Sequence, residues 1–322
     1  MQIDEIFEAD KRLNRKKRTT PLLNSPFLDE IADRQIFIKA ECLQHTGSFK
    51  FRGAYSAISS IPIEKRKKGV IAYSSGNHAQ GVAFAAKIHK IPATIIMPED
   101  APEIKINNTR DLGAEVILYD RLSESREEIG QKISEEKLLS LIPPYDHNDV
   151  IAGQGTIGLE IASQAEQIEI GKADVLVCCG GGGLTSGIAV ALSNLMPDFV
   201  TRPVEPEGFD DVVRSLKSGE RQTNKKISGG LCDAIITPTP GELTFPLMQK
   251  YCGGGIVVTD EEVMKAIALA FTRLRIVVEP GGAVALAAAL FHSKKCDNET
   301  VIAVVSGGNI DPDIFKKALE TI

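Results

Sequence analysis

Short apolar runs and longer amphipathic segments alternate along the chain. The apolar runs have the length of strands; they are IFIKAE, GVIAYS, ATIIMP, AEVILYD, DVLVCC, GIVVTD and VIAVVS, which begin at residues 36, 69, 93, 114, 174, 255 and 301. Most are separated by segments in which apolar residues recur with helical period, such as residues 78–90, 156–167, 185–196 and 260–274. Alternating strands and helices predict an α/β fold, in which helices cover both faces of parallel sheets.

Composition places the chain among ordinary globular proteins. It has 322 residues, of which 43% are hydrophobic, and this length suggests about two domains. The formal net charge of −6 argues against nucleic acid as the main partner. The basic segment KRLNRKKR, residues 11–18, is interpreted as a solvated helical face, with nucleic-acid or membrane binding as the alternative.

The amino terminus and the cysteines indicate a cytoplasmic protein. MQIDEIFEAD is acidic and lacks an apolar signal core, and no apolar run approaches the roughly 18 residues that span a bilayer. The six cysteines form no CxxC pair and no disulfide framework. We therefore expect reduced, structural cysteines, a cytoplasmic location and no membrane partner.

The turns that follow the strands are the first candidates for chemistry, because such sheets bind ligands beyond the carboxyl ends of their strands. GGGGL, residues 180–184, lies between an apolar run and a helical segment. Its glycines allow backbone amides to surround an anion, which predicts phosphate binding. The turn lacks the lysine and hydroxyl of a nucleoside triphosphate loop and the GxGxxG spacing. Glu205 lies where a ribose-binding acid would, so a nicotinamide cofactor remains an alternative.

Two further turns carry small polar residues. In SSGNHAQG, residues 74–81, main-chain donors at a helix start beside Ser74, Asn77 and His78 would suit a carboxylate. A helix capped by Ser75 or Asn77, without a binding role, is the alternative. SGGN, residues 306–309, is equally a permissive turn and a small polar site.

Lys50 lies between Phe49 and Phe51, directly after the first apolar run. Desolvation by these two rings would lower the pKa of the lysine and favour the neutral amine that attacks a carbonyl. An amine that reacts with an aldehyde, together with a phosphate turn, describes pyridoxal phosphate.

The chain resembles the fold type II pyridoxal phosphate enzymes, and within them the group of threonine dehydratases and serine racemases. The resemblance covers nearly the whole chain and rests on motifs in a shared order: RTTPL, ECLQHTGSFKFRGA, SSGNHAQGVA, MPEDAPEIK, VIAGQGTIGLEI, CGGGGLTSG, VEPEG, VVEPGGAVA and VVSGGNID. It implies the tryptophan synthase β-like fold, with two parallel-sheet domains and the cofactor between them. Residues 1–68 and 147–322 would form the large domain and residues 69–146 the small one. No C-terminal regulatory domain is expected, because only 13 residues follow Asn309.

The resemblance also implies how the cofactor is held. Lys50 resembles the lysine that forms the Schiff base and removes the substrate α proton, and Phe49 resembles the residue packed against the ring. Asn77 is similar to the asparagine that binds the ring hydroxyl. Ser306 resembles the serine that faces the pyridine nitrogen; since a neutral hydroxyl does not hold this nitrogen protonated, β-elimination is favoured over transamination. The phosphate loop would consist of Gly180, Gly181, Gly182, Gly183 and Leu184.

The activity implied is that of an ammonia-lyase, which converts L-threonine or L-serine to a 2-oxo acid and ammonia by β-elimination of water. The carboxylate of this small hydroxyamino acid would dock at Ser74, Ser75, Asn77 and His78. Ser75 resembles the serine that exchanges a proton on the face opposite the lysine in serine racemase. A serine or aspartate racemase is therefore an alternative.

Two residues limit the choice of substrate. Arg126 resembles an arginine near the racemase active site and would pair with a second carboxylate, so a 3-hydroxyaspartate ammonia-lyase is the other alternative. A solvated helical salt bridge is the competing interpretation of Arg126. Asp233 is expected near the substrate. Pro143 departs from the family, since many relatives have histidine there.

VEPEGFDD, residues 204–211, is similar to the divalent-cation site of the racemases. Glu205, Asp211 and the main-chain carbonyl of Phe209 would bind magnesium, manganese or calcium, which prefer oxygen ligands. An acidic, solvated loop is the alternative, and Pro203 interrupts the strand that leads to Glu205. A homodimer is expected.

Overall fold

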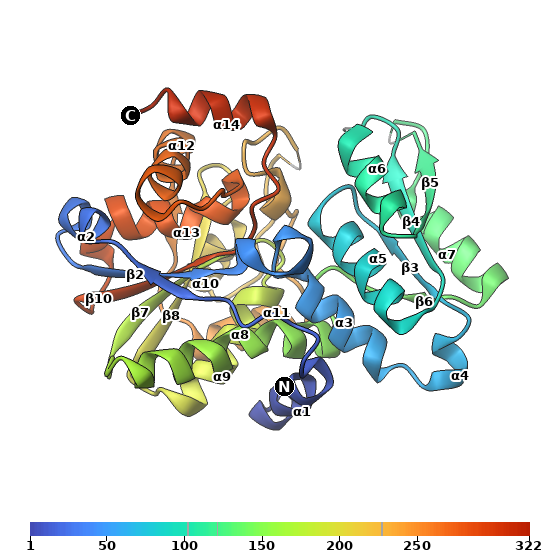
Figure 1. Cartoon of the computed structure of the whole chain (residues 1–322), viewed down its shortest axis with the longest axis horizontal. Coiled ribbons are helices and arrows are strands. Elements are labelled where there is room, and N and C mark those ends of the chain that lie inside the picture. Colours follow the sequence, from blue (N-terminus) through green and yellow to red (C-terminus); the bar gives the residue numbers. More distant parts are fainter. Residues whose placement is uncertain (102, 121, 227) are drawn as a thin grey trace.

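The larger of two sheets organises both ends of the chain. Figure 1 shows the computed structural model, which describes residues 1–101, 103–120, 122–226 and 228–322. In these residues a six-stranded sheet has the order β1–β2–β10–β7–β8–β9, and only its pair β1–β2 is antiparallel. Its strands are Leu22–Asn24 (β1), Gln35–Ala40 (β2), Ala173–Cys178 (β7), Phe199–Pro206 (β8), Ile256–Val258 (β9) and Thr300–Val305 (β10).

The smaller sheet is formed by the middle of the chain. It has the order β5–β4–β3–β6 and is parallel throughout. Its strands are Val70–Tyr73 (β3), Ala93–Pro98 (β4), Glu115–Tyr119 (β5) and Ser140–Leu141 (β6). The two sheets lie side by side in Figure 1.

Helices cover both faces of the six-stranded sheet. The helix α13 packs on β7 and β10, and α9 packs on β7 and β8, with α8 against α9 (Figure 1). The helices around this sheet are Ile3–Leu13 (α1), Pro26–Ala32 (α2), Asn148–Gln167 (α8), Gly183–Leu195 (α9), Asp211–Ser218 (α10), Thr244–Tyr251 (α11), Asp260–Leu269 (α12), Pro280–Phe291 (α13) and Pro312–Leu319 (α14).

The helix α3 connects the two halves, since it packs against both α8 and α5. On the four-stranded sheet, α5 contacts β3 and β4, and α7 contacts β3. The helices of this half are Lys50–Ser60 (α3), Ile63–Arg66 (α4), Asn77–His89 (α5), Glu103–Asp111 (α6) and Arg126–Lys137 (α7). Single turns of 3-10 helix occupy Glu41–Leu43, His45–Gly47, Asp233–Ile235 and Ser293–Lys295, and a π-helical turn occupies Ala270–Leu274.

The predicted α/β fold with parallel sheets is confirmed, and each predicted apolar run contains a strand. Two strands were not predicted, β1 and β6, which have only three and two residues. The strand that leads to Glu205 was expected to be interrupted at Pro203, but β8 continues through this residue, whose Cα pairs with that of Val177. The division into domains at residues 69 and 146 stays a prediction.

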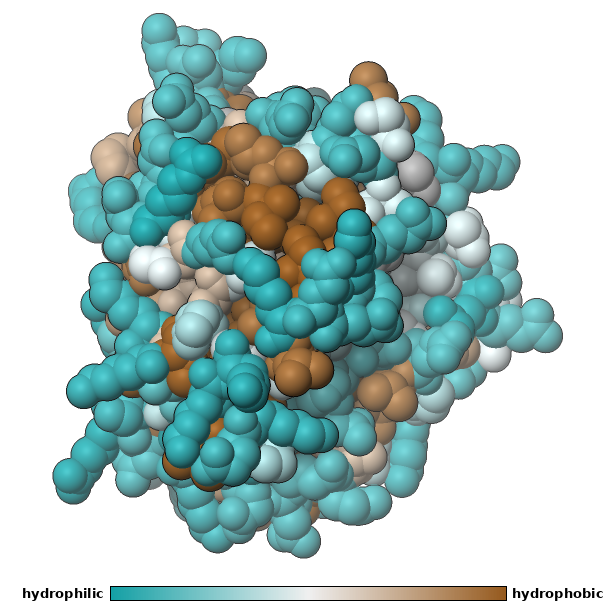
Figure 2. All heavy atoms as spheres, turned by 90° about the vertical axis from the view of Figure 1, so that its right-hand side faces the viewer, coloured by the Kyte–Doolittle hydropathy of each residue, from teal (hydrophilic) through white to brown (hydrophobic). Residues whose placement is uncertain are grey.

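Each sheet has its own apolar core. One cluster of buried side chains fills the space between the six-stranded sheet and its helices, and a second lies between α3, α5 and the four-stranded sheet. Figure 2, which views the molecule from the side of the four-stranded sheet, shows apolar atoms gathered on part of that face. The exposed large apolar residues of this half include Ile104, Leu118, Leu122, Leu138 and Leu141. No helix in the described ranges has the length and apolar character needed to cross a membrane.

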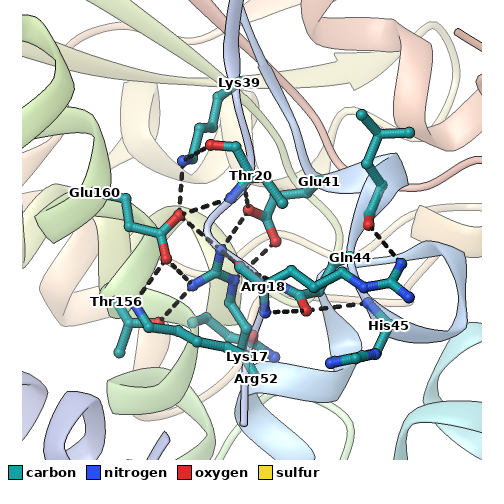
Figure 3. A network of polar contacts seen from close by, with 12 residues as sticks. Lys17, Arg18, Thr20, Lys39, Glu41, Gln44, His45, Arg52, Thr156 and Glu160 are labelled. Atoms are coloured by element: carbon teal, nitrogen blue, oxygen red, sulfur yellow. Dashed lines mark hydrogen bonds and ion pairs between the residues drawn. The ribbon is translucent and has the colours of Figure 1, made fainter. Parts of the chain in front are cut away.

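A buried network of charges holds the segment around Lys50. Arg52, two residues further on, donates to Glu41 (Nη2 to Oε1, 2.7 Å) and to Glu160 (Nη1 to Oε1, 2.7 Å), and it is fully buried (Figure 3). Lys39 donates to the other oxygen of Glu160. Lys17 also pairs with Glu160. The interpretation of residues 11–18 as a solvated helical face is correct only in part, because most of these side chains are exposed, but α1 ends at Leu13 and Lys17 enters this network.

Candidate active site

A cavity of about 260 Å³ lies where the turns that follow β3, β7 and β10 meet. This gathering confirms that the carboxyl ends of the parallel strands face one site. All residues predicted to bind the cofactor or the substrate line the cavity: Phe49, Lys50, Ser74, Ser75, Asn77, His78, Arg126, Gly180, Gly181, Gly182, Gly183, Leu184, Asp233 and Ser306. Their individual roles stay predictions.

Lys50 is the first residue of α3, and its amine faces the cavity. Its Nζ donates to the carbonyl oxygen of Pro144 at 2.9 Å and lies 5.2 Å from the centroid of the Phe49 ring. Burial lowers the pKa of Lys50 to about 8, so a substantial neutral fraction exists near physiological pH. The predicted contribution of Phe51 is wrong, because this ring packs into the core of the four-stranded sheet, against His45, Tyr55 and Phe84.

The glycine turn after β7 can only be built from residues without side chains. Gly182 has φ +92°, and α9 begins at the next residue. A Cβ on Gly181 would overlap the ring of Tyr145, and one on Gly180 would lie 2.7 Å from the carbonyl oxygen of Ile235. The first N–H groups of α9 have no acceptor within the helix, and the helix dipole favours an anion there. The turn therefore fits a phosphate group, and with Lys50 it fits pyridoxal phosphate.

The turn after β3 leads into α5 and holds a neutral histidine. His78 Nε2 donates to the carbonyl oxygen of Ile142 at 2.8 Å. Burial, with the nearby charge of Lys50, lowers the pKa of His78 to about 3, so the ring is uncharged at neutral pH. Ser74 Oγ accepts from the backbone N–H of Gly76 at 3.2 Å, while Ser75 lines the cavity. Uncharged donors at a helix start suit a carboxylate.

Two cations lie at the same cavity on the side of the four-stranded sheet. The guanidinium of Arg126 lies 5.3 Å from the centroid of the Tyr73 ring. Lys105, which the sequence did not single out, has its Nζ 3.7 Å from a carboxylate oxygen of Asp233. Since Lys105 belongs to α6 and Asp233 to the large half of the chain, this ion pair joins the two halves beside the cavity.

Other residues that line the cavity were not assigned to the site from the sequence, among them Tyr145, Pro144, Cys178 and Glu279. Glu279 precedes α13, and burial raises the pKa of its carboxyl group to about 7, although a hydrogen bond from Asn77 opposes the rise. The signal for Glu279 was present, because an acidic residue stands within the otherwise apolar segment VVEPGGAVA. Pro144 could not be found in this way, because it contacts Lys50 through its main-chain carbonyl, which every residue has.

The three predicted cation ligands lie apart from the cavity and close to one another in the chain. Glu205, at the end of β8, accepts from the backbone N–H groups of Val212 and Val213 at 3.0 and 2.7 Å. Asp211 is buried and accepts from Asn224 through Oδ1, but among the described residues its Oδ2 has no hydrogen-bond partner.

Burial raises the pKa of both Glu205 and Asp211, and repulsion between them adds to the rise for Glu205. Within the described ranges, no group of three or more His, Cys, Asp or Glu side chains could hold a metal. Two carboxylates and a main-chain carbonyl nevertheless fit a hard cation, since the unpartnered oxygen of Asp211 is buried without compensation.

Comparisons with known proteins found relatives that match nearly the whole chain. A protein named L-threo-3-hydroxyaspartate ammonia-lyase from Pseudomonas sp is 40% identical over 98% of both chains. One named L-threonine ammonia-lyase from Thermotoga maritima is 41% identical over 98% of this chain and 78% of its own. The solved structure of maize serine racemase matches with a TM-score of 0.92 at 34% identity, over 99% of this chain and 97% of its own.

The family model described as "Pyridoxal-phosphate dependent enzyme" matches residues 13–307. This range contains Lys50, the glycine turn and Ser306. The resemblance found in the sequence is thereby confirmed, and the protein belongs to the pyridoxal-phosphate dependent enzymes.

Proposed function

We propose that the protein is an ammonia-lyase that removes water and then ammonia from a small hydroxyamino acid, with L-threonine and L-serine as its substrates. The observation that carries this proposal is the cavity that joins the amine of Lys50, the glycine turn and the hydroxyl of Ser306. The glycine turn would hold the phosphate of the cofactor, and the amine of Lys50, whose pKa is lowered, lines the same cavity. Ser306 offers a neutral partner to the ring nitrogen rather than a carboxylate.

The roles of the side chains follow from their surroundings. Pyridoxal phosphate supplies the electron sink that makes the α proton of a bound amino acid acidic. Lys50 Nζ accepts this proton, because its lowered pKa makes the neutral amine accessible. The backbone N–H groups of Asn77 and His78 at the start of α5, with the hydroxyl of Ser74, would bind the α carboxylate through uncharged donors. The ring N–H of His78 is already donated to Ile142. Loss of the β hydroxyl as water gives an enamine, whose hydrolysis yields the 2-oxo acid and ammonia.

A second candidate is 3-hydroxyaspartate, and a specific feature favours it. Lys105 and Arg126 both line the cavity and would pair with a second carboxylate. The Pseudomonas relative carries this substrate in its name. Racemisation of serine or aspartate is a third candidate, since Ser75 lines the cavity as Lys50 does and would be the second group that exchanges the α proton.

A substrate panel separates these candidates. We expect purified protein to release 2-oxo acid and ammonia from L-threonine and L-serine, measured by coupled assays, with little inverted amino acid on chiral chromatography. Stereoisomers of 3-hydroxyaspartate are assayed in parallel. Arg126→Met should lower kcat/KM for 3-hydroxyaspartate by roughly tenfold or more and that for threonine much less, because only the first substrate has a second carboxylate. Absence of oxo acid from every substrate would overturn the proposal.

We also propose that Glu205, Asp211 and the carbonyl of Phe209 bind a divalent cation, magnesium, manganese or calcium. Added cation should raise the thermal midpoint of the wild-type protein, by an amount equivalent to about 2.7 kcal/mol at one hundred times Kd. Asp211→Asn should abolish this rise, since it removes one of the charges that bind the ion. The exposed Asp198→Asn is the matched control. An equal rise in both variants would exclude this site.

The proposal includes a cytoplasmic homodimer that binds neither nucleic acid nor membrane. The acidic composition supports the absence of a nucleic-acid partner, whereas the homodimer rests on the resemblance to the family. Sedimentation velocity would establish the assembly directly.

A further inference from the structure

Three polar side chains form a continuous line of hydrogen bonds beside the cavity. Asn309 Nδ2 donates to Asn77 Oδ1 at 2.7 Å, and Asn77 Nδ2 donates to Glu279 Oε1 at 2.5 Å. Asn309 Nδ2 also donates to the main-chain carbonyl of Thr46 at 2.8 Å. Neither Asn309 nor Glu279 has a role in the function described above, although Glu279 lines the same cavity as Asn77.

The contact between Asn309 and Thr46 determines which atoms donate and which accept in these hydrogen bonds. A main-chain carbonyl can only accept, so the side-chain group of Asn309 that faces Thr46 must be its amide nitrogen. The second hydrogen of this nitrogen is directed to Asn77, which must therefore present its oxygen. The amide nitrogen of Asn77 then lies on the other side, where the carboxylate of Glu279 accepts from it. A reversed Asn77 amide would set donor against donor and acceptor against acceptor.

The side-chain amide of Asn77 is left with one N–H group that has no acceptor among the described residues. An amide nitrogen has two hydrogens, and Glu279 takes one of them. Among the described residues the other has no acceptor, while Asn77 itself lines the cavity and is 9% exposed. An amide oriented in this way offers the cavity a donor.

We propose that Glu279 and Asn309 are positioning residues, which orient the Asn77 amide so that its remaining N–H faces the ring oxygen of pyridoxal phosphate. This inference rests on the proposed role of Asn77 in binding that oxygen. A donor at this position stabilises the ionised ring oxygen, whereas a reversed amide would turn an acceptor toward it. The two residues thereby act through Asn77 on the protonation and the affinity of the cofactor.

The line also crosses between the two halves of the chain. Asn77 is the first residue of α5, which packs on the four-stranded sheet. Glu279 precedes α13 and Asn309 follows β10, and both elements belong to the half with the six-stranded sheet. Two glycines allow the close approach: a Cβ on Gly47 would lie 2.6 Å from Asn309 Oδ1, and one on Gly307 would overlap Glu279 Oε1. Asn77 is thus held from both sides by groups on the opposite half.

The test is the cofactor itself, observed in the holoenzyme. Asn309→Asp replaces a donor by an acceptor, so the Asn77 amide should reverse. We expect the Kd for pyridoxal phosphate, measured by equilibrium dialysis, to rise about tenfold or more. The pH midpoint of the cofactor absorption band should move upward by about one unit, because the ionised ring oxygen loses a donor. Glu279→Gln keeps an acceptor for Asn77 and should preserve the Kd within about threefold, whereas Glu279→Leu should not.

A double-mutant cycle separates orientation from general damage. If Asn309 acts through Asn77, then Asn309→Asp should raise the Kd no further in an Asn77→Ala background. An equal factor in both backgrounds would overturn the inference while leaving the role of Asn77 intact. If Asn77→Ala alone changes neither Kd nor spectrum, the proposed role of Asn77 fails and the inference fails with it. Circular dichroism verifies folding, and the exposed Asn107→Asp is the matched control, expected to be unchanged.

Discussion

Lys50→Ala is expected to lower turnover of the substrate by roughly 10³-fold or more, because it removes the group that exchanges the α proton. The residue offers more than a proton acceptor. Its amine is buried in the cavity and has a pKa of about 8, so it is also the nucleophile that would bind the cofactor covalently. The measurement is the initial rate of 2-oxo acid formation with saturating pyridoxal phosphate.

The covalent role has its own readout. Borohydride reduction followed by peptide mass spectrometry should locate the cofactor on Lys50 in the wild type and yield no labelled peptide in the variant. The neutral amine increases as pH rises, so the rate of attachment should increase with pH and level off above about 8 rather than near 10.5, the usual value of a lysine. The exposed Lys294→Ala serves as control. Full turnover by the Lys50 variant, or a label on another lysine, would refute the mechanism.

The fold was accessible from the sequence because its strands are buried on both faces. Such strands appear as continuous apolar runs, and those at residues 93–98, 173–178 and 301–305 lie in the interior of their sheets. The elements that were missed lack this signal. β1 and β6 are too short to show a period. For β8 only the continuity was misjudged, because a proline within a strand usually marks an interruption.

The site could be predicted as far as it depends on single motifs. The glycine turn, the lysine and the polar turn after β3 each have a local signature, and the sheet topology brings them together. What could not be predicted depends on contacts between distant segments. Lys105 meets Asp233 across the two halves, and Asn309 contacts Asn77 over 232 positions. Phe51 was misplaced for a related reason, since residues adjacent in a helix point to different sides.

The helix α3 carries both Lys50, which lines the cavity, and Arg52, which belongs to the buried charge network. Residues two apart on a helix do not share a face, so Lys50 reaches the cavity while Arg52 enters the charge network between β2 and α8 (Figure 3). Burial alone would raise the pKa of Glu160, but Arg52, Lys39 and Lys17 outweigh burial and hold it well below its usual range. The network therefore stabilises the folded chain most where Glu160 is ionised.

Arg52→Ala is expected to lower the free energy of unfolding by about 3–5 kcal/mol, because it leaves Glu41 and Glu160 buried with too few cations. Urea denaturation at pH 7 measures the loss. A group whose folded pKa is depressed contributes stability above its unfolded pKa and loses it as pH falls toward the folded value. Wild-type stability should thus decrease as the pH is lowered below about 4.5, and the variant should show much less of this decrease.

A matched pair of variants separates burial from charge. Lys67 and Glu64 form an exposed ion pair, and Lys67→Ala should cost at most about 1 kcal/mol, because water screens that pair. Glu41→Gln combined with Arg52→Ala should restore part of the loss, since one uncompensated carboxylate is then neutral. If Arg52→Ala costs no more than Lys67→Ala, the network contributes no more than a surface pair, and the position of Lys50 must depend on apolar packing of α3 alone.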